Sequence, residues 1–420
     1  MLCFPEFVAL PIDWNMILYG ATFAAGAAGL ASVFAYENQR NVDVDVVKNR
    51  VAELERLPSR TLEQNDELAA LYAAWATTLY DMEEAELDEI VDVFGKAEAI
   101  LTATLAQGDD ERTRKQLGTV YLSWGAACNG FDDLESAIDI YEKATEVLKP
   151  LEDAADAEAK YDVAGIKLSL GIACREIGEF AKAKKYLDES FLAYRAVEKI
   201  SDDDTRFYMA TVSVQQGNLL YEMGEPLDSV VDAYNRAMRL YVEVIEDQKQ
   251  VELERNLANV LLDRSMVTYE HWLNQKFECE EERKKTIDAV LLDISRGIDL
   301  LEKQYNEGNE AARYDMFHAI ALQGRALCDA EQFEEALVSL DRAVNEFADI
   351  AETSSDILME MVMICHTRAI AHLGLGKQEL SKQDCHKGSE LIDKLLQLYG
   401  DEEDIQELKE QFQELLGHLE

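Results

Sequence analysis

Three glycines, Gly125, Gly171 and Gly217, follow one another at intervals of 46 residues, and each lies in an apolar stretch with helical periodicity. A second apolar stretch follows after a short break, as in LSLGIACREIGEFAKAKKYLDES, where Gly178 marks the break. A period of this length indicates a repeat whose unit is a pair of helices. Because one such pair cannot bury its apolar face alone, the units must stack on one another. The chain is therefore expected to form an elongated helical array.

Composition supports this expectation. The 420 residues include only 5 prolines and 21 glycines, and 48% of them are apolar. Ala, Leu, Glu and Lys, which favour helices, are abundant after residue 40. Few stretches alternate apolar and polar residues with a period of two, so no sheet is expected.

One copy of the pattern, YLSWGAACNGFDDLESAIDIYEKATEVLKP, resembles a tetratricopeptide repeat (TPR). In that family a small residue lets two antiparallel helices approach closely, and apolar residues fill the seam between them. The residues that carry the resemblance are Trp124, Gly125, Ala137, Tyr141, Ala144 and Pro150. The period differs from the family's usual value of about 34 residues, which implies longer helices. The resemblance implies an all-α fold, a right-handed superhelix (solenoid) of about seven TPR-like helical hairpins, with an N-terminal hydrophobic helix and a C-terminal capping helix.

Other copies extend the resemblance over roughly residues 62–398. The small residues that align with Gly125 in them are Ala76, Gly171, Gly217, Ser265, Gly324 and Ala369. The whole pattern predicts a short N-terminal segment at 1–14, a transmembrane or hydrophobic anchor helix at 15–37, a juxtamembrane helix at 38–60, the repeat array at 61–400 and the capping helix at 401–420.

The anchor helix is predicted from Met16–Tyr36, 21 residues without a charge. At about 1.5 Å per residue, a helix of this length just crosses a hydrocarbon core of about 30 Å. Two alternatives are a cleaved signal peptide and a helix buried against other protein. Glu6 and Asp13 precede the segment and no basic residue does, which is atypical of a secretory signal.

Arg40, Lys48 and Arg50 follow the segment, so the positive-inside tendency predicts a single-pass membrane protein whose repeat array is cytoplasmic. Small residues also recur on one face of the segment at intervals of four, which lets helix backbones approach closely in lipid. These candidates for membrane-helix packing are Gly20, Ala24 and Ala28, and they make a homo-oligomer possible.

The net charge of −44 excludes nucleic acid as a partner, because 84 acidic residues against 40 basic ones repel phosphates. The acidity is either a solvated helical surface or a surface for a basic partner protein. Seven widely spaced cysteines without a C-x-x-C pattern argue against a disulfide framework and favour a reducing compartment.

In the TPR family, the first helices of the hairpins line a concave face that holds extended peptides. The resemblance therefore implies a protein-binding role for the polar and aromatic residues at inward positions of these helices. They are Arg175, Asn218, Tyr221, His318, Arg325 and His366. Each also has a plainer interpretation, in which it pairs with a nearby acid or faces solvent.

Two thiol–imidazole pairs, Cys365–His366 and Cys385–His386, offer zinc-ligand chemistry. Neighbouring residues on a helix point about 100° apart, and both cysteines fall at seam positions, so no metal site is expected. No catalytic motif or phosphate loop occurs, so neither an enzyme nor a cofactor is expected.

These features favour a membrane-anchored TPR scaffold or adaptor that binds partner proteins through a concave, acidic repeat surface. One alternative is a structural subunit of a larger assembly, packed through its Ala/Gly-rich N-terminal helix. Another is a secreted or periplasmic TPR protein.

Overall fold

The computed structural model describes residues 44–81, 85–108, 110–154, 156–198, 205–277, 279–347, 355–399 and 403–419. These residues form helices and the turns between them, with no strand among them. The predicted anchor helix, with Gly20, Ala24 and Ala28, lies outside the described residues.

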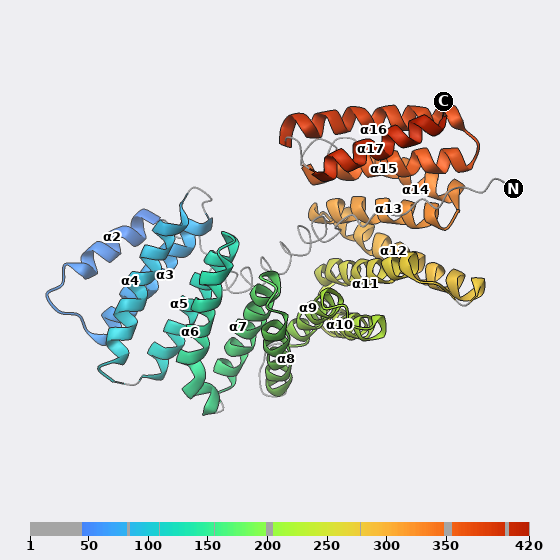
Figure 1. Cartoon of the computed structure of the whole chain (residues 1–420). Coiled ribbons are helices and arrows are strands. Elements are labelled where there is room, and N and C mark those ends of the chain that lie inside the picture. The colour runs from blue at the N-terminus through green and yellow to red at the C-terminus, as the bar shows by residue number, and fades with distance from the viewer. Residues whose placement is uncertain are drawn as a thin grey trace. The chain divides into compact units, whose positions relative to one another are not determined.

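The chain divides into two compact units, with the boundary inside helix α10 (Figure 1). The N-terminal unit, residues 44–244, contains α2 (Val44–Glu55), α3 (Leu62–Asp81), α4 (Leu87–Leu105), α5 (Glu111–Gly130), α6 (Leu134–Asp153), α7 (Ala157–Glu176), α8 (Phe180–Val197), α9 (Arg206–Glu222) and most of α10 (Leu227–Gln248). The C-terminal unit, residues 245–419, contains the 3-10 helix η1 (Val251–Leu253), α11 (Glu254–Asn274), α12 (Glu280–Asn306), α13 (Ala311–Asp329), α14 (Phe333–Glu346), α15 (Ser355–Gly374), α16 (Gln378–Tyr399) and α17 (Glu403–Leu419).

Consecutive helices form hairpins, and within each unit every hairpin packs on the next. The described residues form seven of them: α3/α4, α5/α6, α7/α8 and α9/α10 in the N-terminal unit, and α11/α12, α13/α14 and α15/α16 in the C-terminal unit. We call α3, α5, α7, α9, α11, α13 and α15 the first helices. The all-α helical-repeat fold predicted from the sequence is thus confirmed.

The periodic glycines lie where the two helices of a hairpin touch. A Cβ atom added at Gly125 would lie 2.5 Å from the Tyr141 ring, and one at Gly324 would lie 2.4 Å from Leu340. Neither distance is compatible with a side chain at the glycine. The seam of each hairpin therefore requires a very small residue on the first helix, which accounts for the sequence period.

The turns between paired helices need a left-handed residue. Gly178 and Gly376 adopt φ values of 77° and 72° in two of these turns. Asp132 and Glu331 occupy corresponding turns with φ values of 61° and 58°, although they carry side chains. A left-handed conformation costs such residues free energy that glycine avoids.

Both ends of the array are covered by single helices. Helix α2 packs on α3 through Val47, Val51 and Leu54. Helix α17 packs on α16 at the position expected for the capping helix, and it buries Ile405, Leu408, Phe412, Leu415 and Leu419. Apolar faces that would otherwise be exposed at the ends of the array are thereby removed from water.

One described helix is long and apolar enough to cross a membrane by length and composition, at Ile357–Gly374. However, 67% of this stretch is buried inside the fold, as in the core helix of a soluble domain. It does not test the predicted span at residues 15–37.

We expect Gly125→Ala to lower the free energy of unfolding by about 1–3 kcal/mol, because the Tyr141 ring must move to admit a methyl group. Gly95 lies in helix α4 of the same unit with no atom near its missing Cβ. Gly95→Ala should therefore stabilise the protein by up to about 1 kcal/mol. Urea unfolding followed by circular dichroism measures both, and equal effects of the two substitutions would contradict the seam assignment.

Glu331→Gly should raise the free energy of unfolding by about 1 kcal/mol, because glycine adopts the left-handed turn without steric conflict. Glu335, which lies nearby in the first turn of α14, is the matched control. Glu335→Gly should destabilise the protein, since glycine weakens a helix. Thermal unfolding of both variants checks the signs, and a loss of stability in Glu331→Gly would refute the explanation.

Candidate protein-binding face

First helices of consecutive hairpins touch one another directly. These contacts join α3 to α5, α5 to α7 and α7 to α9 in the N-terminal unit, and α11 to α13 and α13 to α15 in the C-terminal unit. The first helices thus form a continuous layer in each unit. This layer is where the sequence predicted the binding residues.

We define the inner wall of the N-terminal unit by three inward positions on each first helix. They lie three residues before, one residue after and four residues after the small seam residue, which is Ala76, Gly125, Gly171 or Gly217. The residues are Ala73, Thr77 and Tyr80 on α3, Leu122, Ala126 and Asn129 on α5, Leu168, Ile172 and Arg175 on α7, and Val214, Asn218 and Tyr221 on α9. Only Arg175 among them is charged, and none is acidic. The acidic surface expected from the net charge is not found at these positions.

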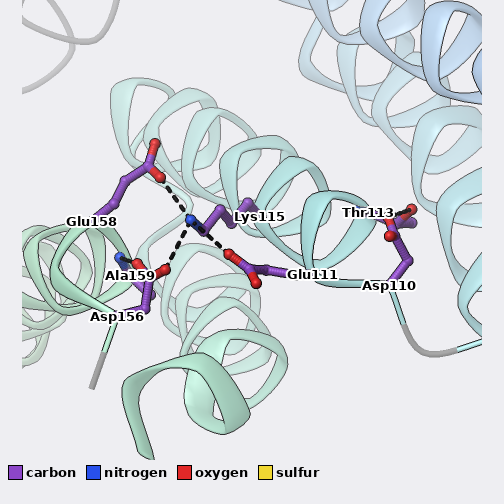
Figure 2. Close-up of polar contacts among 7 residues, drawn as sticks. All are labelled: Asp110, Glu111, Thr113, Lys115, Asp156, Glu158 and Ala159. Carbon is purple, nitrogen blue, oxygen red and sulfur yellow. Dashed lines mark hydrogen bonds and ion pairs between the residues drawn. The ribbon is translucent and has the colours of Figure 1, made fainter. Parts of the chain in front are cut away.

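Acidic side chains gather instead at the N-terminal ends of α5 and α7. Figure 2 shows Lys115 between three carboxylates, with its Nζ 2.7 Å from Glu158 Oε2 and 3.1 Å from both Asp156 Oδ2 and Glu111 Oε1. Burial raises the pKa of the nearby Asp162 to about 6, and the charge of Glu158 adds to the shift. One lysine therefore faces several acids at this end of the wall.

Two of the acids at these helix starts, Asp110 and Asp156, are N-cap residues. The Asp110 carboxylate accepts a hydrogen bond from the Thr113 backbone N–H at 2.8 Å, and Asp156 accepts one from the Ala159 N–H at 2.8 Å (Figure 2). These bonds satisfy free N–H groups at the starts of α5 and α7. They lower the pKa of both carboxyls, so both stay charged near neutral pH.

Arg175 lies at the opposite end of α7, where it is buried. Its Nη1 donates to Gln215 Oε1 at 2.8 Å, and its Nε lies 3.6 Å from Glu222 Oε1. Both partners belong to α9, so Arg175 joins the first helices of two hairpins. Burial raises the pKa of the adjacent Glu176 to about 7, although Arg175 opposes the shift.

Asn218 and Tyr221 are half-buried on α9. The Tyr234 hydroxyl donates a hydrogen bond of 2.6 Å to Asn218 Oδ1 across the α9/α10 hairpin. This bond fixes the orientation of the Asn218 amide. No observation in the structure tests the predicted binding role of Asn218 and Tyr221, so it stays a prediction.

In the C-terminal unit, the predicted residues His318 and Arg325 come together on one carboxylate. His318 Nδ1 lies 3.6 Å from Glu360 Oε2, and Arg325 Nη2 lies 3.5 Å from Glu360 Oε1. Burial favours the neutral form of Glu360, but Arg325 and His318 more than offset it and lower the pKa. No sequence pattern pointed to Glu360, which lies on α15, the first helix of the next hairpin.

Similar contacts join α11 to α13. Arg255 donates two hydrogen bonds to Asp315, from Nε at 2.6 Å and from Nη2 at 3.2 Å. The Tyr269 hydroxyl donates to Asp329. Charged and polar groups of these first helices are thus bound by neighbouring repeats, which fixes the stacking of the C-terminal unit.

His366 packs edge-on against Phe412 of the capping helix, with ring centroids 5.2 Å apart. Burial lowers its pKa to about 4, so it is uncharged at neutral pH. Cys365 and Cys385 are buried, which raises the pKa of each thiol. No group of three or more candidate metal ligands occurs among the described residues.

No protein-family model and no curated protein matches the sequence significantly. Among solved structures, the apo form of RapI is similar with a TM-score of 0.52 and 12% identity, over 95% of this chain and 98% of that one. BtubC from P. vanneervenii is similar with a TM-score of 0.47 and 14% identity, over 63% and 91%. A tetratricopeptide repeat protein from Parabacteroides merdae has a TM-score of 0.30 and 13% identity, over 71% and 99%.

The identities are too low to carry a function from these proteins, and the likeness to RapI concerns the fold. The stacked hairpins and their glycine seams agree with that likeness. This chain therefore has the tetratricopeptide-like helical-repeat fold.

Proposed function

We propose that this protein is a membrane-anchored scaffold that binds partner proteins through the inner wall of its N-terminal unit, with no catalytic step of its own. The observation that carries the proposal is the wall itself: a layer of touching first helices whose inward positions are almost free of charge. Such a surface contacts a partner without leaving charges desolvated.

The chemistry of the wall suits an extended polypeptide. Asn129 and Thr77, whose hydroxyl donates to the Ala73 carbonyl oxygen, are half-buried polar residues of the wall, and Tyr80 and Tyr221 place half-buried rings there. Tyrosine is favoured at binding surfaces because it gives a large contact area for few rotatable bonds.

The acids at the helix ends favour a basic partner. Glu111, Asp156 and Glu158 share a single lysine at the start of α5 and α7. With a net charge of −44, the chain attracts cationic groups over a long range. The wall then supplies the contact, and the surrounding acids increase the rate of encounter.

The C-terminal unit has a different role in this proposal. Two of its inward residues, His318 and Arg325, already face Glu360. Removing either side chain would weaken a buried contact between α13 and α15. We assign these two residues to stacking, and we place the binding face in the N-terminal unit.

The anchor is the segment Met16–Tyr36. It contains six Leu, Ile, Phe or Val residues, which at about 0.3–0.6 kcal/mol each contribute roughly 2–4 kcal/mol to insertion. Ten of its 21 residues are Ala or Gly, which add little to the free energy of insertion. Insertion is therefore weak, and pairing through Gly20, Ala24 and Ala28 would strengthen it. A structural subunit built around this helix is the second candidate.

Ala126→Glu tests the wall, because it places a charge at a half-buried inward position of α5. The matched control is Ala99→Glu at an exposed position of α4. The amount of partner protein that residues 41–420 capture from the source cells should fall at least about ten-fold with Ala126→Glu. It should stay constant with Ala99→Glu. Mass spectrometry of the captured proteins and circular dichroism of each variant are the measurements.

Equal capture by both variants would reject the wall as the binding face. Raising salt from about 50 mM to about 500 mM should release the wild-type partner, because salt screens attraction between exposed charges. If the captured amount does not change with salt, the proposal of a basic partner is rejected, but the wall is still the proposed binding face.

Vesicle flotation tests the anchor. The full chain should float with neutral phosphatidylcholine vesicles, and residues 41–420 should remain at the bottom because they lack the segment. Gly20→Ile should leave flotation intact but reduce cross-linked oligomers, since the larger side chain prevents close helix packing. A full chain that stays unbound and forms regular particles without lipid would favour the structural subunit.

A further inference from the structure

We propose that the turns inside hairpins α5/α6, α7/α8 and α9/α10 form a docking surface for a basic amphipathic helix of a partner protein. We call these turns, residues 131–133, 177–179 and 223–225, the turn edge. It begins two residues beyond the last wall positions, Asn129, Arg175 and Tyr221. The proposal therefore concerns a different surface from the inner wall and does not rest on the proposed function.

The three turns share one sequence pattern. Each has an apolar residue, a residue with positive φ and an acidic residue, in that order. The triplets are Phe131-Asp132-Asp133, Ile177-Gly178-Glu179 and Met223-Gly224-Glu225. The corresponding turns of α13/α14 and α15/α16 are Ala330-Glu331-Gln332 and Leu375-Gly376-Lys377, and neither has an acid at the third place. The pattern thus distinguishes these turns of the N-terminal unit.

The apolar member of the pattern is exposed. Phe131 is 41% exposed and Ile177 is 39% exposed, whereas Met223 is half-buried. The Phe131 ring lies beside the Tyr80 ring of the preceding hairpin, with centroids 6.1 Å apart, which extends the row to α3. Large apolar side chains at equivalent places on neighbouring repeats form a patch, and a partner that removes this patch from water gains free energy.

The backbone of the turn edge is already hydrogen-bonded. In each turn the N–H of the acidic residue donates to the carbonyl oxygen five residues earlier. The pairs are Asp133–Cys128 at 2.9 Å, Glu179–Cys174 at 2.8 Å and Glu225–Leu220 at 3.0 Å. A partner strand finds no free N–H there, whereas a partner helix bonds its own backbone and needs only side-chain contacts.

The spacing of the turns fits such a helix. Three consecutive hairpins are separated by two intervals, and packed helices lie roughly 8–10 Å apart, so the row spans about 16–20 Å. On a helix, residues seven positions apart are about 10.5 Å apart along the axis, and three of them span about 21 Å. One apolar residue of the partner can therefore face each turn.

Acidic residues surround the row. Those in the turns or directly before them are Asp132, Asp133, Glu176, Glu179, Glu222 and Glu225. Two basic residues accompany them, because Arg175 lies between Glu176 and Glu222, and Lys182 pairs with Glu179. Burial raises the pKa of Glu176 to about 7, and the charges of Asp132 and Glu222 add to the shift against that of Arg175. Acids of three hairpins thus repel one another, and Lys or Arg beside the apolar residues of a partner would relieve this repulsion.

A synthetic peptide tests the turn edge on the full chain. The probe is a fluorescent helical peptide of about 18 residues, with Leu at every seventh position and Lys three residues on either side of each Leu. Phe131→Ser together with Ile177→Ser should weaken its affinity at least about ten-fold, because the apolar row is lost. Leu192→Ser removes an apolar side chain that is 61% exposed on α8, and it should leave the affinity unchanged. Fluorescence anisotropy measures the affinities, and circular dichroism verifies that each variant folds.

Asp132→Asn together with Glu225→Gln tests the charge, since asparagine tolerates the left-handed conformation at position 132. This variant should weaken peptide binding at least about five-fold. The matched control, Glu146→Gln together with Asp153→Asn, removes two exposed acids from the C-terminal half of α6 and should change the affinity by less than about two-fold. Equal losses in the two variants would overturn the proposal, because they would indicate attraction to the net charge alone.

A photoreactive group at the central Leu of the peptide locates the site directly. Mass spectrometry should find the cross-links in the turns of α5/α6, α7/α8 and α9/α10. Cross-links confined to inner-wall residues, or a peptide that does not bind, would overturn the proposal. Capture of partners by the wall is measured separately with Ala126→Glu, so failure of one proposal is distinguishable from failure of the other.

Discussion

Close packing at one small residue per hairpin is the contact on which the rest of this structure depends. At Gly125 and Gly324 no Cβ atom fits between the paired helices, since Tyr141 and Leu340 occupy that space. The paired helices therefore pack tightly, and consecutive hairpins stack so that first helices touch first helices. Without this seam the first helices would not form a layer, and there would be no wall to bind anything.

The two units use that layer differently. In the N-terminal unit the inward positions are uncharged apart from Arg175, which is bound to α9 through Gln215. In the C-terminal unit, Arg325 and Glu360 face each other across consecutive first helices. Inward charges in that unit hold repeats together, because a buried ion must find its counterion within the protein. In the N-terminal unit, the half-buried inward positions of α3, α5 and α9 are the surface that we propose for another polypeptide.

Much of the fold could be predicted from the sequence because the seam imposes a local rule with a fixed period. The helix pairs, the glycine turns and the capping helix around Phe412 follow from such local patterns. The candidate site was predicted less well. His318 and Glu360 are 42 residues apart, and only stacking brings them together. The acidic inner surface was inferred from net charge, which is a sum over the whole chain and does not say which face carries the acids.

The N-terminal wall is the surface that we propose a partner covers. Hydrogen exchange of the chain with and without a captured partner measures this directly, because amides under a bound polypeptide exchange more slowly. We predict added protection in α3, α5 and α9, centred on Thr77, Ala126 and Val214. Protection confined to the second helices α4, α6 and α8, with the wall unchanged, would contradict it.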